Sequence, residues 1–181
     1  MKMKLLLAAV IVAASAFTGC DLGINPLIFD APAATAKFRV DETVSSSFDN
    51  SAVVDLEEIS TNIDADIDSV KVFNITLQID STAGTSPATT ISGSALVDGN
   101  PLLTLSGTAI SQFASERSIF DSTLAGGPVY MSAGVQHLIS VLRQRPLPAV
   151  TVRAFGTASG LPLHFTIRLR VYAQIFTPAP K

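Results

Sequence analysis

The sequence predicts a mainly β protein: either a β-sandwich or an α+β fold with an antiparallel sheet, about two helices and a long C-terminal hairpin. Apolar and polar residues alternate along several short segments, which is the period of a half-buried strand. Only 15% of the residues are charged and there is no Trp, while the β-branched residues that pack well on pleated sheets are frequent. An Asp-Gly pair also separates two strand-like segments, which is typical of a hairpin. We therefore expect a single β-rich domain over residues 36–176.

The first predicted strand is Ala36–Val40, in which Phe38 and Val40 share one face and the intervening residues are basic. Asp41–Asn50 is polar and rich in Ser, so it is predicted to be a loop. Ala52–Asp55 is either a short strand or the lead into the next element.

A helix is predicted over about residues 56–68 because apolar residues recur there at helical spacing. The predicted stripe consists of Leu56, Ile59, Ile63, Ile67 and Val70. The segment Asp64–Asp68 also alternates between acidic and apolar residues, so a strand stays open as an alternative there.

Three further strands are predicted at Val70–Asp80, Thr89–Val97 and Leu102–Ile110, and the last two form a hairpin around Asp98-Gly99. In the first of them, one face would hold Phe73, Ile75, Leu77 and Ile79. The mixed character of Ser111–Leu124 allows a short helical turn.

A second helix is predicted over Tyr130–Arg145, which Pro146 and Pro148 would end. Its buried stripe would consist of Met131, Val135, Leu138, Ile139 and Leu142.

The C-terminal part has the clearest alternation in the chain. Strands around Val150–Phe155 and over Leu163–Ile175 would flank a turn at Ser159–Pro162, and residues 177–181 would be a tail. The inner face of the last strand would hold Leu163, Phe165, Ile167, Leu169, Val171, Ala173 and Ile175.

Pairing of these two strands as a hairpin would gather positive charge on one polar face. A four-residue loop would place Arg153 opposite Arg168 and Thr151 opposite Arg170, with His164 nearby on the same face. Because like charges directly opposite destabilise a sheet, the predicted site is a face for an anionic partner made by Arg153, Arg168, Arg170 and His164. Solvent screening, or the acidic segment Asp64–Asp68 lying close by, would explain the same residues without a partner.

The first twenty residues have the layout of a secretory signal peptide. Lys2 and Lys4 precede the apolar segment Leu5–Phe17, which is shorter than the about 20 residues that span a bilayer. The following Thr18-Gly19-Cys20 resembles the lipobox of bacterial lipoprotein precursors, although that family usually has an aliphatic residue in place of Phe17. The resemblance implies removal of residues 1–19 and acyl chains on Cys20. Residues 20–35 would then be a lipidated N-terminus and flexible tether.

The resemblance also implies a place in the bacterial cell envelope, outside the cytoplasm. Asp21 resembles an inner-membrane retention signal, but that signal differs between bacterial groups, so the choice of membrane stays open. Cys20 is the only cysteine, and the fold must therefore be stable without a disulfide.

Charge is divided unevenly along the chain. Residues 21–80 have a net charge of −9, and residues 81–181 have a net charge of +4. Within one domain this division indicates that the two halves pack with complementary charges. A dense basic patch of the kind that nucleic-acid binders need is missing from the sequence.

No complete catalytic or metal-binding motif is found in the sequence. The Asp64-x-Asp66-x-Asp68 pattern lacks the Gly and the bidentate Glu of a calcium loop. The two histidines, His137 and His164, belong to different predicted elements, and neither lies in a zinc or nucleophile motif. We expect no enzyme activity, no cofactor and no metal.

The sequence thus predicts a non-catalytic, lipid-anchored envelope protein that acts as a structural or binding module for an envelope protein or lipid. The alternative is a carrier of a hydrophobic ligand or lipid. A carrier would need an apolar pocket of about 300 Å³ or more, whereas a scaffold module would have a filled core.

Overall fold

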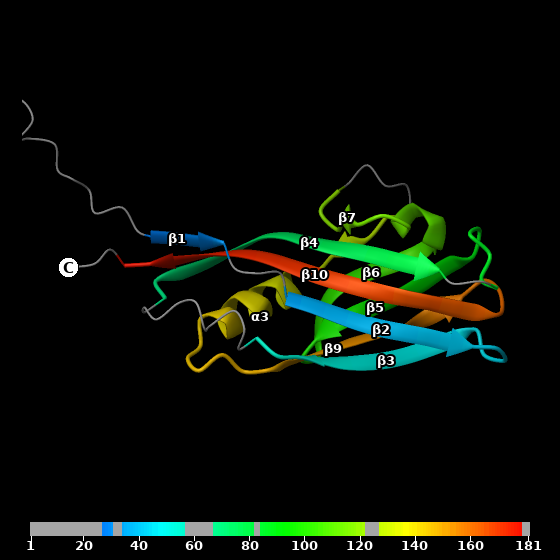
Figure 1. The fold of residues 1–181 in the computed structure, drawn as a ribbon, viewed down its shortest axis with the longest axis horizontal. Helices are drawn as coiled ribbons and strands as arrows, with labels where there is room; N and C mark the ends of the chain where they lie inside the picture. Colours follow the sequence, from blue (N-terminus) through cyan, green and yellow to red (C-terminus); the bar gives the residue numbers. More distant parts are fainter. Residues whose placement is uncertain (1–26, 31–33, 57–66, 82–83, 122–126, 179–181) are drawn as a thin grey trace, which may run out of the picture.

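The computed structural model describes residues 27–30, 34–56, 67–81, 84–121 and 127–178, which form two antiparallel sheets packed face to face (Figure 1). This is the β-sandwich that the sequence predicted as one of its two fold classes. A single hydrophobic core draws residues from both sheets.

The first sheet is built around β10 (Leu163–Thr177), which runs the length of the molecule. On one side β10 pairs with β1 (Leu27–Asp30) and with β2 (Ala34–Glu42), and on the other it pairs with β4 (Ser69–Ser81). The short β7 (Arg117–Ser118) follows β4.

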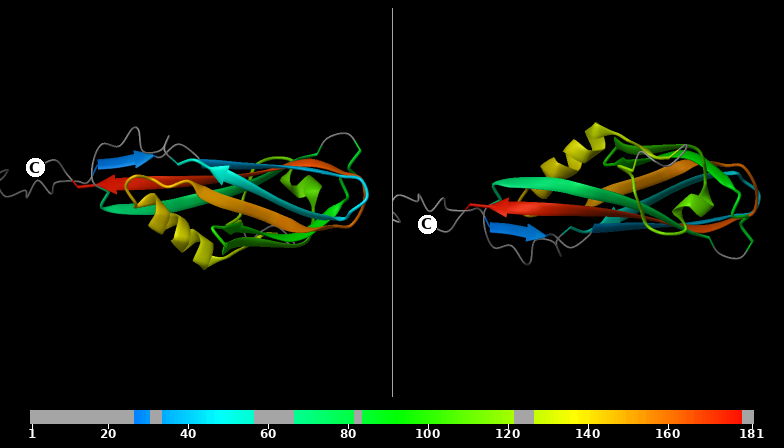
Figure 2. Two further views of the ribbon diagram at one scale, coloured as in Figure 1. Left: turned by 90° about the horizontal axis from the view of Figure 1, so that it is seen from below. Right: turned by 90° about the horizontal axis from the view of Figure 1, so that it is seen from above.

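The second sheet has the strand order β3, β9, β5, β6, β8. The bounds of these strands are Ser47–Val54 for β3, Val150–Ala158 for β9, Thr90–Val97 for β5, Asn100–Ala109 for β6 and Val129–Tyr130 for β8. Figure 2 shows that β1 lies at one end of the elongated sandwich, with the β2–β3 and β9–β10 turns at the other.

The Asp-Gly hairpin is confirmed. Val97 of β5 lies opposite Asn100 of β6, so Asp98 and Gly99 are the only residues of the turn. Both have positive φ, 48° and 81°, which is the conformation that a two-residue hairpin turn of this kind requires.

The predicted helix over Tyr130–Arg145 is confirmed as α3, but it covers only Ser132–Leu142. Tyr130 instead pairs in β8, and Met131 lies at the N-cap with 39% of its surface exposed. A Cβ added to Gly134 would lie 2.5 Å from the carbonyl oxygen of Pro101, so the absence of a side chain there lets α3 pack directly on β6.

The helical turn allowed within Ser111–Leu124 is present as the 3-10 helix η1 (Ile110–Phe113). It buries Ile110 and Phe113 completely. The segment that follows it leads to the edge of the first sheet, where β7 pairs with β4.

The inner face of β10 is the one that its sequence predicted. Ile167 and Leu169, at the centre of the strand, are buried, and the ring of Phe165 packs edge-on against that of Phe48 from the other sheet, with centroids 5.9 Å apart. The alternation continues through Thr177, which is fully buried, so the strand extends to the first residue of the expected tail.

The face predicted for the strand Val70–Asp80 is wrong at Phe73. The pairing between β4 and β10 shifts by one residue there, because Asn74 lies opposite Tyr172 whereas Val72 lies opposite Ala173. The extra residue reverses the alternation, and Phe73 is consequently 47% exposed beside the ring of Tyr172.

Two segments predicted to lack regular structure form strands. The polar loop expected at Asp41–Asn50 shrinks to the residues between β2 and β3, because Phe48 is buried while its polar neighbours face outward at the sheet edge. The tether expected over residues 20–35 contains β1, whose backbone pairs with the last residues of β10.

The predicted C-terminal hairpin is also wrong. β9 and β10 are consecutive strands, but they belong to different sheets, and each is already paired on both sides within its own sheet. The turn at Ser159–Pro162 therefore carries the chain across the sandwich, so that the apolar faces of the two strands meet in the core.

The helix predicted over about residues 56–68 falls mainly on residues 57–66, which lie outside the described residues, as do Asp64 and Asp66 of the calcium-like pattern. Of the helices that the structure describes, none has the length and apolar character needed to cross a bilayer.

Candidate functional site

The four residues predicted to form one face for an anionic partner lie on opposite sides of the sandwich. His164, Arg168 and Arg170 lie on the outer face of the first sheet, whereas Arg153 lies on the outer face of the second. The prediction of one cluster is wrong because it depended on the hairpin between β9 and β10. Each of the four side chains instead has a carboxylate partner.

Arg153 forms a two-nitrogen ion pair with Asp49 of β3. Its Nε donates to Oδ1 at 2.8 Å and its Nη2 donates to Oδ2 at 2.5 Å. These bonds lower the pKa of Asp49 and raise the pKa of Arg153. The guanidinium also lies 5.1 Å from the ring centroid of Phe155, and these contacts account for Arg153 without a partner molecule.

Arg170 belongs to a network around Glu116, which the sequence did not indicate. Glu116 accepts hydrogen bonds from the hydroxyl of Thr76 at 2.5 Å, from the hydroxyl of Tyr172 at 2.6 Å and from Nη1 of Arg170. The bond from Thr76 is the largest cause of a lowered pKa at Glu116, followed by the bond from Tyr172. The same hydrogen bond to Glu116 raises the pKa of Tyr172.

This network fastens the segment between η1 and β7 to the first sheet. Thr76 lies on β4, and Arg170 and Tyr172 lie on β10, so Glu116 joins two strands to the segment that leads to the edge strand β7. A hydrogen bond from the Ser118 hydroxyl to the Asn74 side chain at 2.7 Å adds a second attachment.

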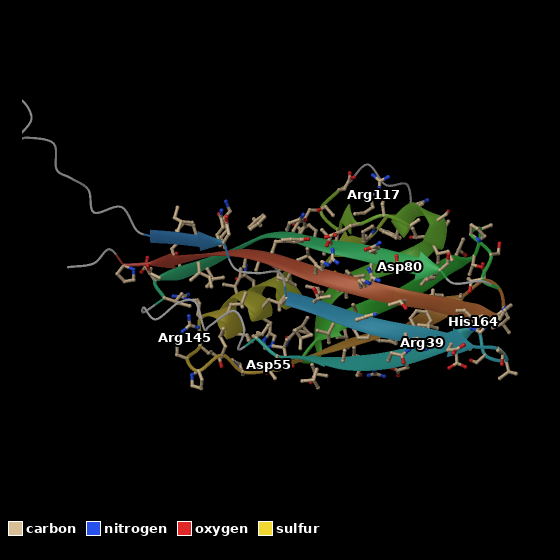
Figure 3. The ribbon with its side chains drawn as sticks, in the orientation of Figure 1. Arg39, Asp55, Asp80, Arg117, Arg145 and His164 are labelled. Carbon is tan, nitrogen blue, oxygen red and sulfur yellow. The ribbon has the colours of Figure 1, made fainter. Side chains whose placement is uncertain are left out.

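The remaining two predicted residues lie nearer the end of the sandwich that is opposite to β1. Arg168 contacts Asp80 of β4 at 2.8 Å, and Nδ1 of His164 lies 2.5 Å from Oδ1 of Asp41 on β2. Figure 3 shows His164, Arg39 and Asp80 at this end. The ion pairs of Arg153 and Arg168, together with the contact between His164 and Asp41, join the acidic and basic halves of the chain, as the charge division indicated.

A surface groove of about 640 Å³ lies between β2 and β10 at this end. Its polar side chains come from Lys37, Arg39 and Asp41 of β2 and from His164 and Thr166 of β10. The sequence placed Lys37 and Arg39 together on the polar face of a strand. It did not reveal that β10 would be the neighbouring strand, and the groove was missed for that reason.

The register places Thr166 between Arg39 of β2 and Asp80 of β4, with Lys37 and Arg168 at the next outward-facing positions. Arg39 lies directly opposite Thr166, and Lys37 lies directly opposite Arg168. Arg39 contacts Asp41 at 3.2 Å while its side chain stays 80% exposed, and no ion pair joins Lys37 to any other residue that the structure describes. We take the groove and these cations as the candidate binding site.

Two small apolar cavities, each of about 30 Å³, lie among the described core residues. One is lined partly by α3 and the other lies between the two sheets near Phe48. A volume of this size is about that of one water molecule. It is about a tenth of the pocket volume that a carrier of a hydrophobic ligand would need.

His137, which lies outside the groove, has a structural contact with Asp98. No group of three or more His, Cys, Asp or Glu side chains in the described part of the chain could hold a metal ion. Nε2 of His137 lies 2.8 Å from Asp98, whose other carboxylate oxygen accepts from the backbone N–H of Thr151. This pair connects α3 to the β5–β6 turn and to β9.

The class of protein that this structure defines is a two-sheet antiparallel β-sandwich with charged outer faces. No family model matches the sequence, and no curated protein matches it.

Structures of two viruses are among the solved structures with some similarity to this chain. A structure of Desmodium yellow mottle tymovirus has 10% identity and a TM-score of 0.31, covering 86% of this chain and 90% of that chain. A structure of turnip yellow mosaic virus at 100 K has 11% identity and a TM-score of 0.28, with coverages of 83% and 96%. A second structure of that virus has 12% identity and a TM-score of 0.29, with coverages of 83% and 84%. TM-scores of this size carry no argument about function.

Proposed function

We propose that this protein is a non-catalytic, lipid-anchored lipoprotein of the bacterial cell envelope that acts as a structural or binding module. The observation that carries the proposal is the segment Met1–Cys20, with its basic start, its short apolar stretch and Thr18-Gly19-Cys20 at its end. Stable anchoring takes more than one acyl chain, as the resemblance to lipoprotein precursors implies for Cys20.

The position of β1 supports this arrangement. Leu27 is only seven residues beyond Cys20. Seven residues span at most about 25 Å even when the chain is fully extended. An anchor on Cys20 would therefore hold the end of the sandwich at which β1 lies, and the β2–β3 and β9–β10 turns would be the farther end (Figure 1).

The interior of the sandwich favours a module over a carrier. Leu169 borders both apolar cavities, and the core side chains around them leave about 30 Å³ in each. A lipid chain would not fit in either volume without moving the two sheets apart. Binding by the described domain is therefore assigned to its polar surface.

The proposal predicts that Cys20→Ser abolishes acylation. Cells that express the wild-type chain and are fed a radioactive fatty acid should yield a labelled protein of the processed size. The serine variant should carry no label and should accumulate as an uncleaved or soluble species, because the thiol that would receive the acyl chain is missing.

Ser15→Ala is the matched control, since it changes a small side chain in the same segment and leaves Cys20 intact. It should keep the label. An unlabelled wild-type protein would contradict the lipoprotein proposal.

A further inference from the structure

The groove between β2 and β10 contains an arrangement of charges that is unfavourable in isolation. Lys37 and Arg168 are directly opposite each other on neighbouring strands, where like charges destabilise the pair. Arg168 is compensated by Asp80. Lys37 is exposed and forms no ion pair with another described residue, so an anion placed beside it would remove the repulsion.

The neighbouring positions would help to bind such an anion. Arg39 lies two residues along β2 on the same face, and its side chain stays 80% exposed beside its contact with Asp41, so most of the guanidinium can still donate. Thr166, directly opposite Arg39, offers a hydroxyl donor at the side of the same groove. Lys37 and Arg39 are separated by about 7 Å, the rise of two residues in a strand.

We propose that this groove binds an acidic, extended segment of a partner protein. Acidic side chains at alternate positions of an extended segment share one face and repeat at the same distance of about 7 Å. Two of them would therefore meet Lys37 and Arg39 in turn. The proposal rests on the function proposed above, and it assigns the binding role of the module to the groove.

The charge of the whole face favours a discrete acidic segment over an anionic membrane. Within the described residues the outer face of the first sheet mixes both signs, and a planar anionic surface would meet the acids as well as the bases. The chain as a whole has a net charge of −3. The bases are Lys37, Arg39, Lys71, Arg168 and Arg170, and the acids are Asp30, Asp41, Asp80 and Glu116.

Lys37, which lines the groove, directly faces a second cation, Arg168, across the paired strands at the end of the groove. Lys71, by contrast, lies opposite the neutral Gln174. The need for an added anion is therefore greatest in the groove around Lys37.

The regular course of β2 supports an extended ligand. β2 pairs with β10 over nine consecutive residues without a register shift, and no described strand pairs with its other side. An extended segment lying over the outer face of this regular strand would pass Lys37 and Arg39 in turn. Basic residues on an edge strand such as β2 commonly prevent self-association of sheets. An acidic segment would neutralise the charges of these residues.

The test measures binding of a fluorescent, end-capped peptide of alternating glutamate and alanine to the purified full chain, by anisotropy at about 10 mM salt, where screening is weak. Lys37→Gln combined with Arg39→Gln should raise the dissociation constant about tenfold, because each exposed charge pair contributes a few-fold. Binding to the wild type should weaken as salt is added. The matching glutamine–alanine peptide should not bind.

Lys71→Gln combined with Arg117→Gln is the matched control. It removes the same two charges from exposed positions outside the groove, so it should leave the dissociation constant unchanged. Equal weakening by both double variants, or no binding of the acidic peptide to the wild type, would overturn the proposal. Binding of the wild type to phosphatidylglycerol vesicles but not to the peptide would assign the groove to lipid and would overturn it as well.

Charge reversal gives a second measurement, which detects a gain of binding to a basic peptide rather than a loss of binding to the acidic one. Lys37→Glu with Arg39→Glu should bind a lysine–alanine peptide in preference to the glutamate–alanine peptide, and retention of the original preference would contradict the groove assignment. Acylation of Cys20 is determined by mass spectrometry on the same preparation. Failure of peptide binding is thereby distinguished from failure of the lipid-anchor proposal.

Discussion

Replacing Phe165 with alanine is expected to lower the free energy of unfolding by about 3–5 kcal/mol. Phe165 is 1% exposed, and its ring meets that of Phe48 across the two sheets. Removing the ring would leave a cavity that the backbone of β10 cannot close, because that strand is paired on both sides at this position. The measurement is a urea titration that compares the unfolding midpoint and its slope with those of the wild type.

Phe73→Ala is the matched control for this prediction. It deletes the same ring from a residue of the first sheet that is 47% exposed. The ring of Phe73 is tilted relative to that of Tyr172. The expected loss is below about 1.5 kcal/mol. A larger loss for Phe73 than for Phe165 would mean that the register shift in β4 is misplaced and that the face originally predicted for Phe73 is the buried one.

The faces of the strands could be predicted because the period of a strand directly determines which residues share a side. The long alternation from Leu163 to Ile175 identified the buried face of β10, and Asp98-Gly99 identified a turn whose φ values few other residues adopt. The alternation and the Asp-Gly turn both depend on residues that are close together in the chain, so a single sequence is enough to predict them. The register shift at Phe73 interrupts such a pattern without leaving any mark in the sequence.

Strand partners could not be predicted in the same way. β9 and β10 each have one apolar face and are joined by a short turn, which fits a hairpin and a crossing between sheets equally well. Only the packing of both apolar faces into one core separates the two arrangements. The choice of the hairpin placed Arg153 beside Arg168, although the residue that lies opposite Arg168 is Lys37 of β2.

The candidate site was predicted in part for the same reason. The sequence identified His164 and Arg168 as members of a charged outer face, but their partners lie far away in the chain. Glu116 gave no signal at all, since it lies between elements and its bonding partners are Thr76, Arg170 and Tyr172 from two different strands. Pairing across a sheet has to be known before such a residue can be found.

Glu116→Ala is expected to lower the free energy of unfolding by about 1.5–3 kcal/mol, the range for hydrogen bonds to a charged group. The change would remove the acceptor of three side chains and leave Arg170 without its carboxylate on the outer face of β10. It would also remove one of the attachments between the segment around β7 and the sheet, while the bond from Ser118 to Asn74 and the β7–β4 pairing stay. Urea unfolding at neutral pH measures the loss.

The same residue should make stability depend on pH, and Glu116→Gln measures that dependence. The hydrogen bonds from Thr76 and Tyr172 and the charge of Arg170 hold the pKa of Glu116 below its ordinary value of 4.5. The folded state therefore favours the ionised carboxylate, and its contribution to stability is complete above the ordinary pKa. It should be lost as the pH falls from about 4.5 through the lowered pKa.

The difference in unfolding free energy between the wild type and Glu116→Gln should accordingly be constant at neutral pH and shrink in acid. Glu42→Gln makes the same chemical change at the end of β2, where the side chain forms no hydrogen bond or ion pair with another described residue. It should follow the wild-type pH dependence. A difference between the wild type and Glu116→Gln that stayed constant down to about pH 2 would show that Glu116 contributes through its shape alone, because a carboxylate bound as an anion must lose that contribution once it is protonated.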